Sequence, residues 1–208
     1  YKIDVLDIPT HKKCQRKDSD DEIYMTEREK YNAILKEVSS VHAKGCPILI
    51  GTESVEVSEK LSRIFRQNKL EHNVLNAKQP EKEAEIVADA GKRGAITIST
   101  NMAGRGTDIK LEPGVAELGG LYVLGTTRHQ SRRIDRQLRG RSARQGDPGI
   151  SKFYISFEDP LLRLFSSPRI TAILQRFRPD EGEPISAPML DRSIATAQKR
   201  IEGDRKSV

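Results

Sequence analysis

Short apolar runs alternate along this chain with helical patterns of about 10 to 15 residues, and this alternation constrains the fold more than any other feature. The apolar runs predict strands at 47–52, 72–77, 95–100, 119–127 and 151–157. The helical patterns predict helices at 26–44, 53–68, 80–91 and 131–141. Strands that alternate with helices form βαβ units, so we expect an α/β fold whose parallel sheet carries helices on both faces.

The segments on either side of this region differ in character from it. We interpret residues 1–24 as a mixed-charge linker from a preceding domain, and we place the α/β domain at 25–165. Asp21 and Glu22 belong to this linker rather than to an acidic metal-binding pair, because polar residues and no apolar strand precede them. The chain has no initiator methionine, and we expect it to be a piece of a longer protein.

Residues 166–208 are predicted to be a helical extension, with a short helix at 166–177, a proline-rich loop and a helix that starts at Pro188. The last helix places four apolar residues on one face, Leu190, Ile194, Ala197 and Ile201. This face either packs back on the core or begins a longer helix that docks on another domain.

Positive charge is concentrated in one stretch of a chain whose formal net charge is +6. Residues 128–144 carry seven arginines and one acid, Asp135. Such an excess favours an anionic partner, which is a nucleotide phosphate, a nucleic acid or an acidic membrane surface. Cys14 and Cys46 are too few for a disulfide framework or a zinc site, and we expect reduced thiols in a cytosolic setting.

Ligands of parallel α/β sheets bind at the carboxyl ends of the strands, which points to the loops at 51–54, 100–108 and 126–131. The second loop lies in TNMAGRGTDI (100–109), where Gly104 and Gly106 flank Arg105 and let the backbone approach a ligand. Asp108 would accept hydrogen bonds from ribose hydroxyls or pair with a neighbouring arginine. The alternative is an ordinary turn from strand to helix, with Asp108 as the N-cap.

The arginine-rich stretch ends in QLRGRSARQGD (137–147). On a helix Gln137, Arg141 and Arg144 would share one face, and Gly140 beside it would leave room for a ligand. Planar guanidinium groups pair with phosphate and suit an arginine-finger role in phosphoryl transfer. A solvated basic face or a nucleic-acid patch is the alternative interpretation.

The phosphate-cradling pattern G-x-x-x-x-G-K-[ST] is absent, because the one Gly-Lys pair, Gly91 and Lys92, continues into Arg93. We therefore expect the chain to supply arginines to a nucleotide that it cannot hold alone.

Two stretches resemble known motifs. TISTNMAGRGTDI resembles motif V, and RRIDRQLRGRSARQGDPG resembles motif VI, of the superfamily-2 helicase-type motors. GGLYVLGTTRHQSRRIDRQLRGR, which runs into SKFYISFEDPLLRLF, is similar to the SecA family of preprotein translocase ATPases, and the similarity covers nearly the whole chain. The resemblance implies a second nucleotide-binding domain with a RecA-like, P-loop NTPase-type fold that lacks its own P-loop, followed by the start of a helical scaffold.

The resemblance also implies roles for particular residues. The catalytic set would be Gln137, Arg141 and Arg144, with both arginines facing the γ-phosphate. The residues around the nucleotide would be Gly104, Arg105, Gly106, Thr107 and Asp108, with Arg105 linking the two motor domains. ATP and Mg²⁺ would be held mainly by the first domain, so this chain alone is not expected to hydrolyse ATP. Ala143, Thr127 and Gln130 depart from residues that are common in the family.

The implied activity is protein export, in which ATP hydrolysis moves preproteins through the SecYEG channel. The implied partners are the first nucleotide-binding domain, SecYEG, preproteins and acidic membrane lipids, with no nucleic acid as the main ligand and with homodimerisation of the full-length protein left open. The implied location is the bacterial cytoplasm and the cytoplasmic face of the inner membrane. The alternative is the second domain of a nucleic-acid helicase. The loops at 52–54 and 77–80 disfavour it, since they are mostly neutral or acidic.

Overall fold

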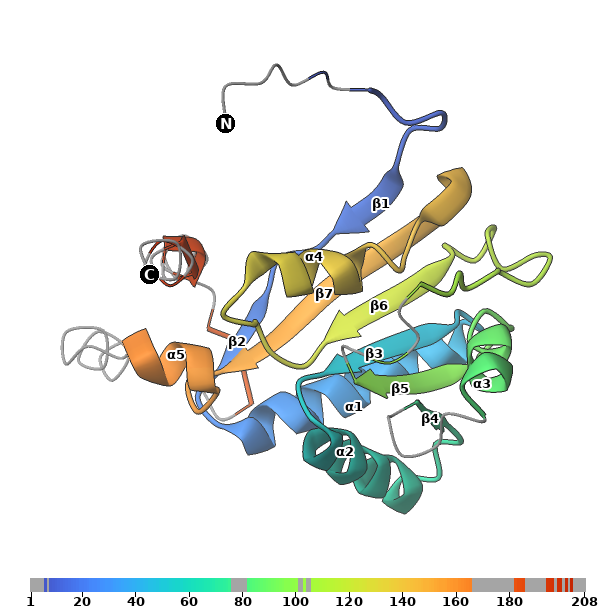
Figure 1. Ribbon diagram of the computed structural model, residues 1–208. Coiled ribbons are helices and arrows are strands. Elements are labelled where there is room, and N and C mark those ends of the chain that lie inside the picture. The colour runs from blue at the N-terminus through green and yellow to red at the C-terminus, as the bar shows by residue number, and fades with distance from the viewer. Residues whose placement is uncertain are drawn as a thin grey trace.

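A seven-stranded parallel sheet forms the centre of the molecule (Figure 1). The strand order is β1-β7-β6-β3-β5-β4, and β2 pairs with the same edge of β7 as β1 does. The computed structural model describes residues 6, 8–75, 82–100, 103, 106–165, 182–185, 194–196, 198, 199, 201 and 203. All of the pairings are parallel, so the predicted α/β class is confirmed.

The elements follow one another in βαβ order. The strands are β1 (Gln15–Asp18), β2 (Glu22–Tyr24), β3 (Ile48–Thr52), β4 (Asn73–Leu75), β5 (Ile96–Thr100), β6 (Leu121–Gly125) and β7 (Pro148–Ser156). The helices are α1 (Glu27–Ala43), α2 (Val55–Gln67), α3 (Glu83–Asp89), α4 (Arg132–Arg139) and α5 (Pro160–Phe165). A short 3₁₀ turn spans Arg144–Gly146. No described helix is long and apolar enough to cross a bilayer.

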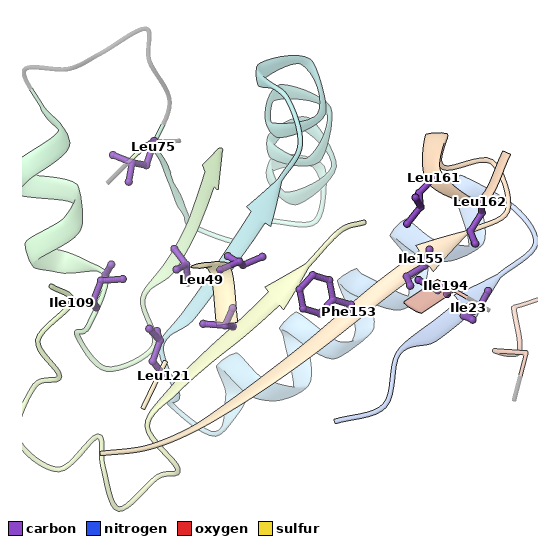
Figure 2. Close-up of a cluster of buried hydrophobic side chains, with 14 of the residues drawn as sticks. Ile23, Leu49, Leu75, Ile109, Leu121, Phe153, Ile155, Leu161, Leu162 and Ile194 are labelled. Atoms are coloured by element: carbon purple, nitrogen blue, oxygen red, sulfur yellow. The ribbon is translucent and has the colours of Figure 1, made fainter. Parts of the chain in front are cut away.

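Side chains of the strands point alternately into two hydrophobic layers, as a sheet buried on both faces requires. In β3, Ile48 and Ile50 pack under α1 and α2, whereas Leu49 points to the opposite layer. The opposite layer is built from α3, α4 and α5, and its side chains are shown in Figure 2. Phe153 of β7 lies fully buried in that layer.

The strands β1 and β2 lie within the segment that we interpreted as a linker. They pair with the amino and carboxyl halves of β7, and Asp21 at the junction is almost fully buried. The interpretation of Asp21 and Glu22 as linker residues is therefore wrong, although the boundaries of the domains remain a prediction. The sequence QRKD of β1 concealed the strand, because an edge strand with exposed side chains needs no apolar pattern.

The C-terminal extension reaches the core through the residues described there. Ile194 is 4% exposed and Ile201 packs against the same layer, so packing back on the core is the arrangement found for these two. Leu190, Ala197 and the helix predicted at 166–177 lie outside the described residues.

Candidate functional site

A cavity of about 210 Å³ opens between the carboxyl end of β5 and the end of α4. Four of the eight site residues expected from the sequence line it, namely Gly106, Gln137, Arg141 and Arg144. Ser99 and Thr100 of β5 contribute to the same wall. We refer to it as the arginine cavity. It joins the two sequence stretches that were singled out separately, 100–109 and 137–147.

Close packing of α4 on the sheet places this cavity. A Cβ atom on Gly51 of β3 would lie 2.4 Å from Cδ2 of Leu138, so the glycine permits α4 to approach. Leu138 is itself buried. Ser142, just after the helix, donates a hydrogen bond of 2.7 Å to the carbonyl of Leu121 in β6 and anchors the following turn. The arginine residues therefore emerge from a backbone that is fixed to the sheet on both sides.

The path of the chain after α4 differs from the prediction. The helix ends at Arg139 with Gly140 as its C-cap, and Ala143 and Gln145 adopt left-handed backbone angles, φ 57° and 56°. The expectation that Gln137, Arg141 and Arg144 share a helix face is therefore wrong. A tight turn brings the three residues to one cavity instead, which a helical wheel cannot represent.

Arg141 reaches across the cavity to the loop after β5. Its Nη2 donates a hydrogen bond of 2.9 Å to the carbonyl oxygen of Ala103. Burial, followed by the positive charge of Arg144, lowers the pKa of Arg141. A guanidinium remains protonated at any physiological pH, so the cavity contains a fixed positive charge that a phosphate would stabilise.

Arg144 forms an ion pair with Asp108, with 3.0 Å between Nη1 and Oδ1. The same arginine donates from Nε to the carbonyl of Gly140 at 2.9 Å and from Nη1 to that of Thr107 at 3.3 Å. Of the two partners considered for Asp108, the structure thus shows the arginine. Both side chains remain more than one-third exposed, so an incoming phosphate has access to the pair.

The loop that carries Asp108 is not a helix start. No helix begins within residues 106–120, so the alternative of Asp108 as an N-cap is wrong. Gly106 has φ +87°, a backbone conformation that favours glycine, and a Cβ there would meet nothing within 4 Å. Gly104 and Arg105 lie outside the described residues. Thr107 is exposed beside Arg144 but does not line the cavity.

Within the part of the chain that the structure describes, no three His, Cys, Asp or Glu side chains gather in a way that could hold a metal. The donors at the arginine cavity are guanidinium groups, which suit anions and repel cations.

A buried polar cluster that the sequence pattern did not indicate lies on the other side of α4. It is formed by Asp21, Arg128, His129, Asp135 and Gln198. Asp135 is 3% exposed at its side chain and accepts hydrogen bonds from Arg128, His129 and Gln198. One signal was present, because Asp135 is the single acid among the seven arginines of 128–144. Its partners could not be read from the sequence, since Asp21 and Gln198 lie far away along the chain.

Comparison with known proteins identifies the family to which this chain is similar. A family model described as the SecA P-loop domain matches residues 13–116 and 111–182. The protein translocase subunit SecA of Chlamydia pneumoniae is 65% identical over 203 residues, 98% of this chain and 21% of the relative. The same subunit of Chlamydia abortus is 65% identical over 202 residues, 97% of this chain and 21% of the relative. The chain thus spans about a fifth of the length of these curated relatives.

Solved structures show the same fold at low sequence identity. The E. coli DEAD-box protein SrmB, bound to the regulator of ribonuclease activity A, has a TM-score of 0.55 and 17% identity, covering 74% of this chain and 83% of that one. Domain 2 of the DEAD-box helicase Mss116p, bound to an RNA duplex, has a TM-score of 0.54 and 16% identity, covering 86% and 68%. The fold is therefore the RecA-like fold of these helicase domains.

Proposed function

The chain belongs to the SecA family, and on that premise we propose that it is the second nucleotide-binding domain of an ATP-driven protein translocase. The arginine cavity carries this proposal. It gathers Gln137, Arg141 and Arg144 at the carboxyl edge of the sheet, where ligands of such sheets bind. In the full-length protein this edge would face ATP held mainly by the first nucleotide-binding domain.

The two arginines would act on the charge that develops during phosphoryl transfer. Arg141 would exchange its bond to the Ala103 carbonyl for an oxygen of the γ-phosphate, and Arg144 would turn from Asp108 toward the same group. Asp108, released from the arginine, would accept hydrogen bonds from the nucleotide. Gly106 would allow the backbone of this loop to approach the nucleotide. Gly104, Arg105 and Thr107 belong to the same proposed nucleotide-binding loop.

The cofactor would be ATP with Mg²⁺. Guanidinium groups and a glycine-containing loop fit the anionic phosphates, whereas the described residues offer no metal-binding cluster. We propose that the Mg²⁺ ligands lie mainly on the first domain, as the family resemblance implies. When bound, the ion would neutralise the charge of the β- and γ-phosphates.

Closure of the two domains over ATP and reopening after hydrolysis would drive transport. The proposed substrates are preproteins, moved through SecYEG, and the proposed location is the bacterial cytoplasm and the cytoplasmic face of the inner membrane. Acidic lipids are proposed as a further contact. These proposals concern the whole protein, because the curated relatives are about five times as long as this chain.

The variant Arg141→Ala in the full-length protein tests the site. We expect kcat for ATP hydrolysis to fall about 100-fold or more, because a finger arginine acts on the transition state. Binding of ATP, measured by titration of a fluorescent analogue, should persist. The matched control is Arg63→Ala, which removes an exposed arginine from α2. Wild-type turnover by Arg141→Ala would contradict the assignment, and so would robust ATP hydrolysis by this chain alone.

A further inference from the structure

The helix α4 makes functional contacts on two sides. Gln137 lines the arginine cavity, and the chain continues from the end of the helix to Arg141 and Arg144. Asp135, two positions before Gln137, points to the other side, since successive helical residues turn by about 100°. That side contains the buried polar cluster and the C-terminal helical residues. A rotation of α4 about its axis would thus move both sites together.

Asp135 is the centre of the buried polar cluster. Its Oδ1 accepts hydrogen bonds from the backbone N–H of His129 at 3.0 Å and lies 2.9 Å from Nδ1 of the same residue. Its Oδ2 accepts from Arg128 at 3.4 Å and from Gln198 at 2.8 Å. A carboxylate this deeply buried depends on such donors, because a buried charge that lacks partners is strongly destabilising.

Arg128 connects the buried polar cluster to the sheet. It donates to both carboxylate oxygens of Asp21 at 2.7 Å, and its guanidinium lies 4.1 Å from the centre of the Phe153 ring. Burial alone would lower the pKa of Arg128, but the hydrogen bonds and charge of Asp21, together with Asp135, outweigh burial and raise it. The cluster is therefore anchored to β7 and to the segment before β2.

Gln198 is the member that belongs to the C-terminal helical residues. The residue is 4% exposed, and its Nε2 donates both to the carbonyl of His129 at 2.6 Å and to Asp135. Both amide protons are thus used on the loop and helix that lead to the arginine cavity. Ile194, one turn earlier, is buried in the core beside it.

We propose that Gln198 is a positioning residue for ATP hydrolysis, acting through Asp135 on α4 and so on Arg141 and Arg144. This inference rests on the proposed function of the arginine cavity. When the C-terminal helical residues pack against α4 and Gln198 donates to Asp135, the carboxylate has all of its donors and α4 is held in place. When they move away, Asp135 loses a donor, and α4 shifts to recover one. The position of the C-terminal helix and the rate of hydrolysis are thereby linked.

Gln198→Glu in the full-length protein tests the contact directly. It places a carboxylate where the amide donates to Asp135, so the two charges repel. Hydrogen exchange of the backbone amides at 194–203 should become about tenfold faster or more. The kcat for ATP hydrolysis should fall about fivefold or more, with KM for ATP changed less than about twofold, because the arginines act in the transition state.

A rescue variant separates positioning from general damage. In Asp135→Asn/Gln198→Glu the new amide can donate to the new carboxylate, which removes the repulsion between the two charges and reverses the direction of that hydrogen bond. The carbonyl of His129 still lacks the donor that Gln198 supplies. Both the exchange rates and kcat should then recover in part, and the coupling would appear in the double-mutant cycle. Lys199→Gln is the matched control, because it changes the charge by the same amount at the neighbouring exposed position.

Three outcomes would overturn the proposal: exchange in Gln198→Glu equal to that of Lys199→Gln, faster exchange with unchanged kcat, or no recovery in the double variant. If Gln198→Glu does not fold, Gln198→Ala removes the donor without repulsion, and wild-type exchange in that variant would also overturn it. Failure of the proposed function itself is visible separately, as wild-type hydrolysis by Arg141→Ala. The exchange measurements do not depend on that result.

Discussion

Two lysines beside one tyrosine show how burial sets the contribution of an ion pair. The ammonium groups of Lys30 and Lys60 lie 5.2 and 4.7 Å from the centre of the Tyr31 ring. Lys30 pairs with Asp159 at 2.5 Å, and both side chains are 3% exposed. Lys60 pairs with Glu27 at 2.8 Å, with exposures of 51% and 37%. The chemistry of the two pairs is alike, so exposure is the main variable.

We expect Lys30→Met to lower the free energy of unfolding by about 3–5 kcal/mol, because the Asp159 carboxylate would stay buried without its cation. Lys60→Met should cost less than about 1 kcal/mol, since water replaces the lost partner of Glu27. Urea denaturation at neutral pH measures both values. Equal losses in the two variants would show that burial is not the deciding factor.

The lowered pKa of Asp18 should make the stability of the protein depend weakly on pH in the acid range. Hydrogen bonds from Arg16, opposed by partial burial and reinforced by Ser151, lower the pKa of Asp18 to about 2. A carboxyl with a lowered folded pKa stabilises the protein above its unfolded pKa, and this contribution is lost as the pH falls from about 4 to about 2. The pair is partly exposed, so its contribution should stay below about 1 kcal/mol.

Replacing Asp18 by Asn should therefore reduce stability at pH 6 and make little difference near pH 2. Urea midpoints measured from pH 6 down to pH 2.5 would show the two curves converging as the pH falls. Asp20→Asn, at an exposed position two residues away, is the control. Curves that stay parallel across this range would refute the lowered pKa.

The residues of the candidate site could be predicted where they lie close together in the sequence. They could not be predicted where a contact depends on a residue far away along the chain. Glycines and arginines within a few positions of each other indicated the arginine cavity, and four of the expected residues line it. The pair between Arg144 and Asp108 joins positions 36 apart, and it was expected only as one of two options. Gln198 and Asp135 are 63 apart, and nothing local in the sequence pairs them.

Helix starts offer a test at the scale of single elements. Thr26 caps α1 by accepting a hydrogen bond from the backbone N–H of Glu29, whose carboxylate accepts one from the N–H of Thr26. Thr26 and Glu29 therefore form a capping box. Ser131 occupies the same position before α4 but makes no side-chain capping bond.

We expect Thr26→Ala to cost about 1 kcal/mol of unfolding free energy, because it leaves a helix donor unsatisfied. The same truncation at Ser131 should have an effect close to zero on stability. Thermal unfolding of the two variants gives the comparison. A loss at Ser131 as large as that at Thr26 would mean that the N-cap residue acts through something other than the capping bond.

Elements with a strong apolar pattern were predicted to within a few residues, and weakly patterned ones were not. The run PILIGT predicted β3, whose residues are all buried. The strand β1 has a polar sequence and gains its place only by pairing with β7. The predicted end of α4 lies two residues beyond the observed end at Arg139. Gly140 and the left-handed conformation of Ala143 stop the helix, although the sequence pattern there still looks helical.

At the scale of the whole molecule, the arginine-rich stretch is balanced by acids from distant parts of the chain. Arg128 pairs with Asp21, Arg139 lies 3.5 Å from Asp18, and Arg144 pairs with Asp108. The positive charge counted along the sequence is thus partly neutralised in space. We expect this partial balance to favour a site for one compact anion over an extended track for a polyanion, which requires many unneutralised cations.

That balance leads to a prediction about the helicase alternative, which shares the fold of this chain. We expect this chain to show no measurable, salt-dependent affinity for single-stranded RNA. Arg128 and Arg144 are engaged with acids, and the exposed Glu53 lies just after β3, in a loop where a helicase would need phosphate donors. Fluorescence anisotropy with a labelled single-stranded RNA at about 50 and 200 mM salt measures this affinity. Affinity that drops about tenfold or more between the two salt concentrations would favour a nucleic-acid motor over a protein translocase.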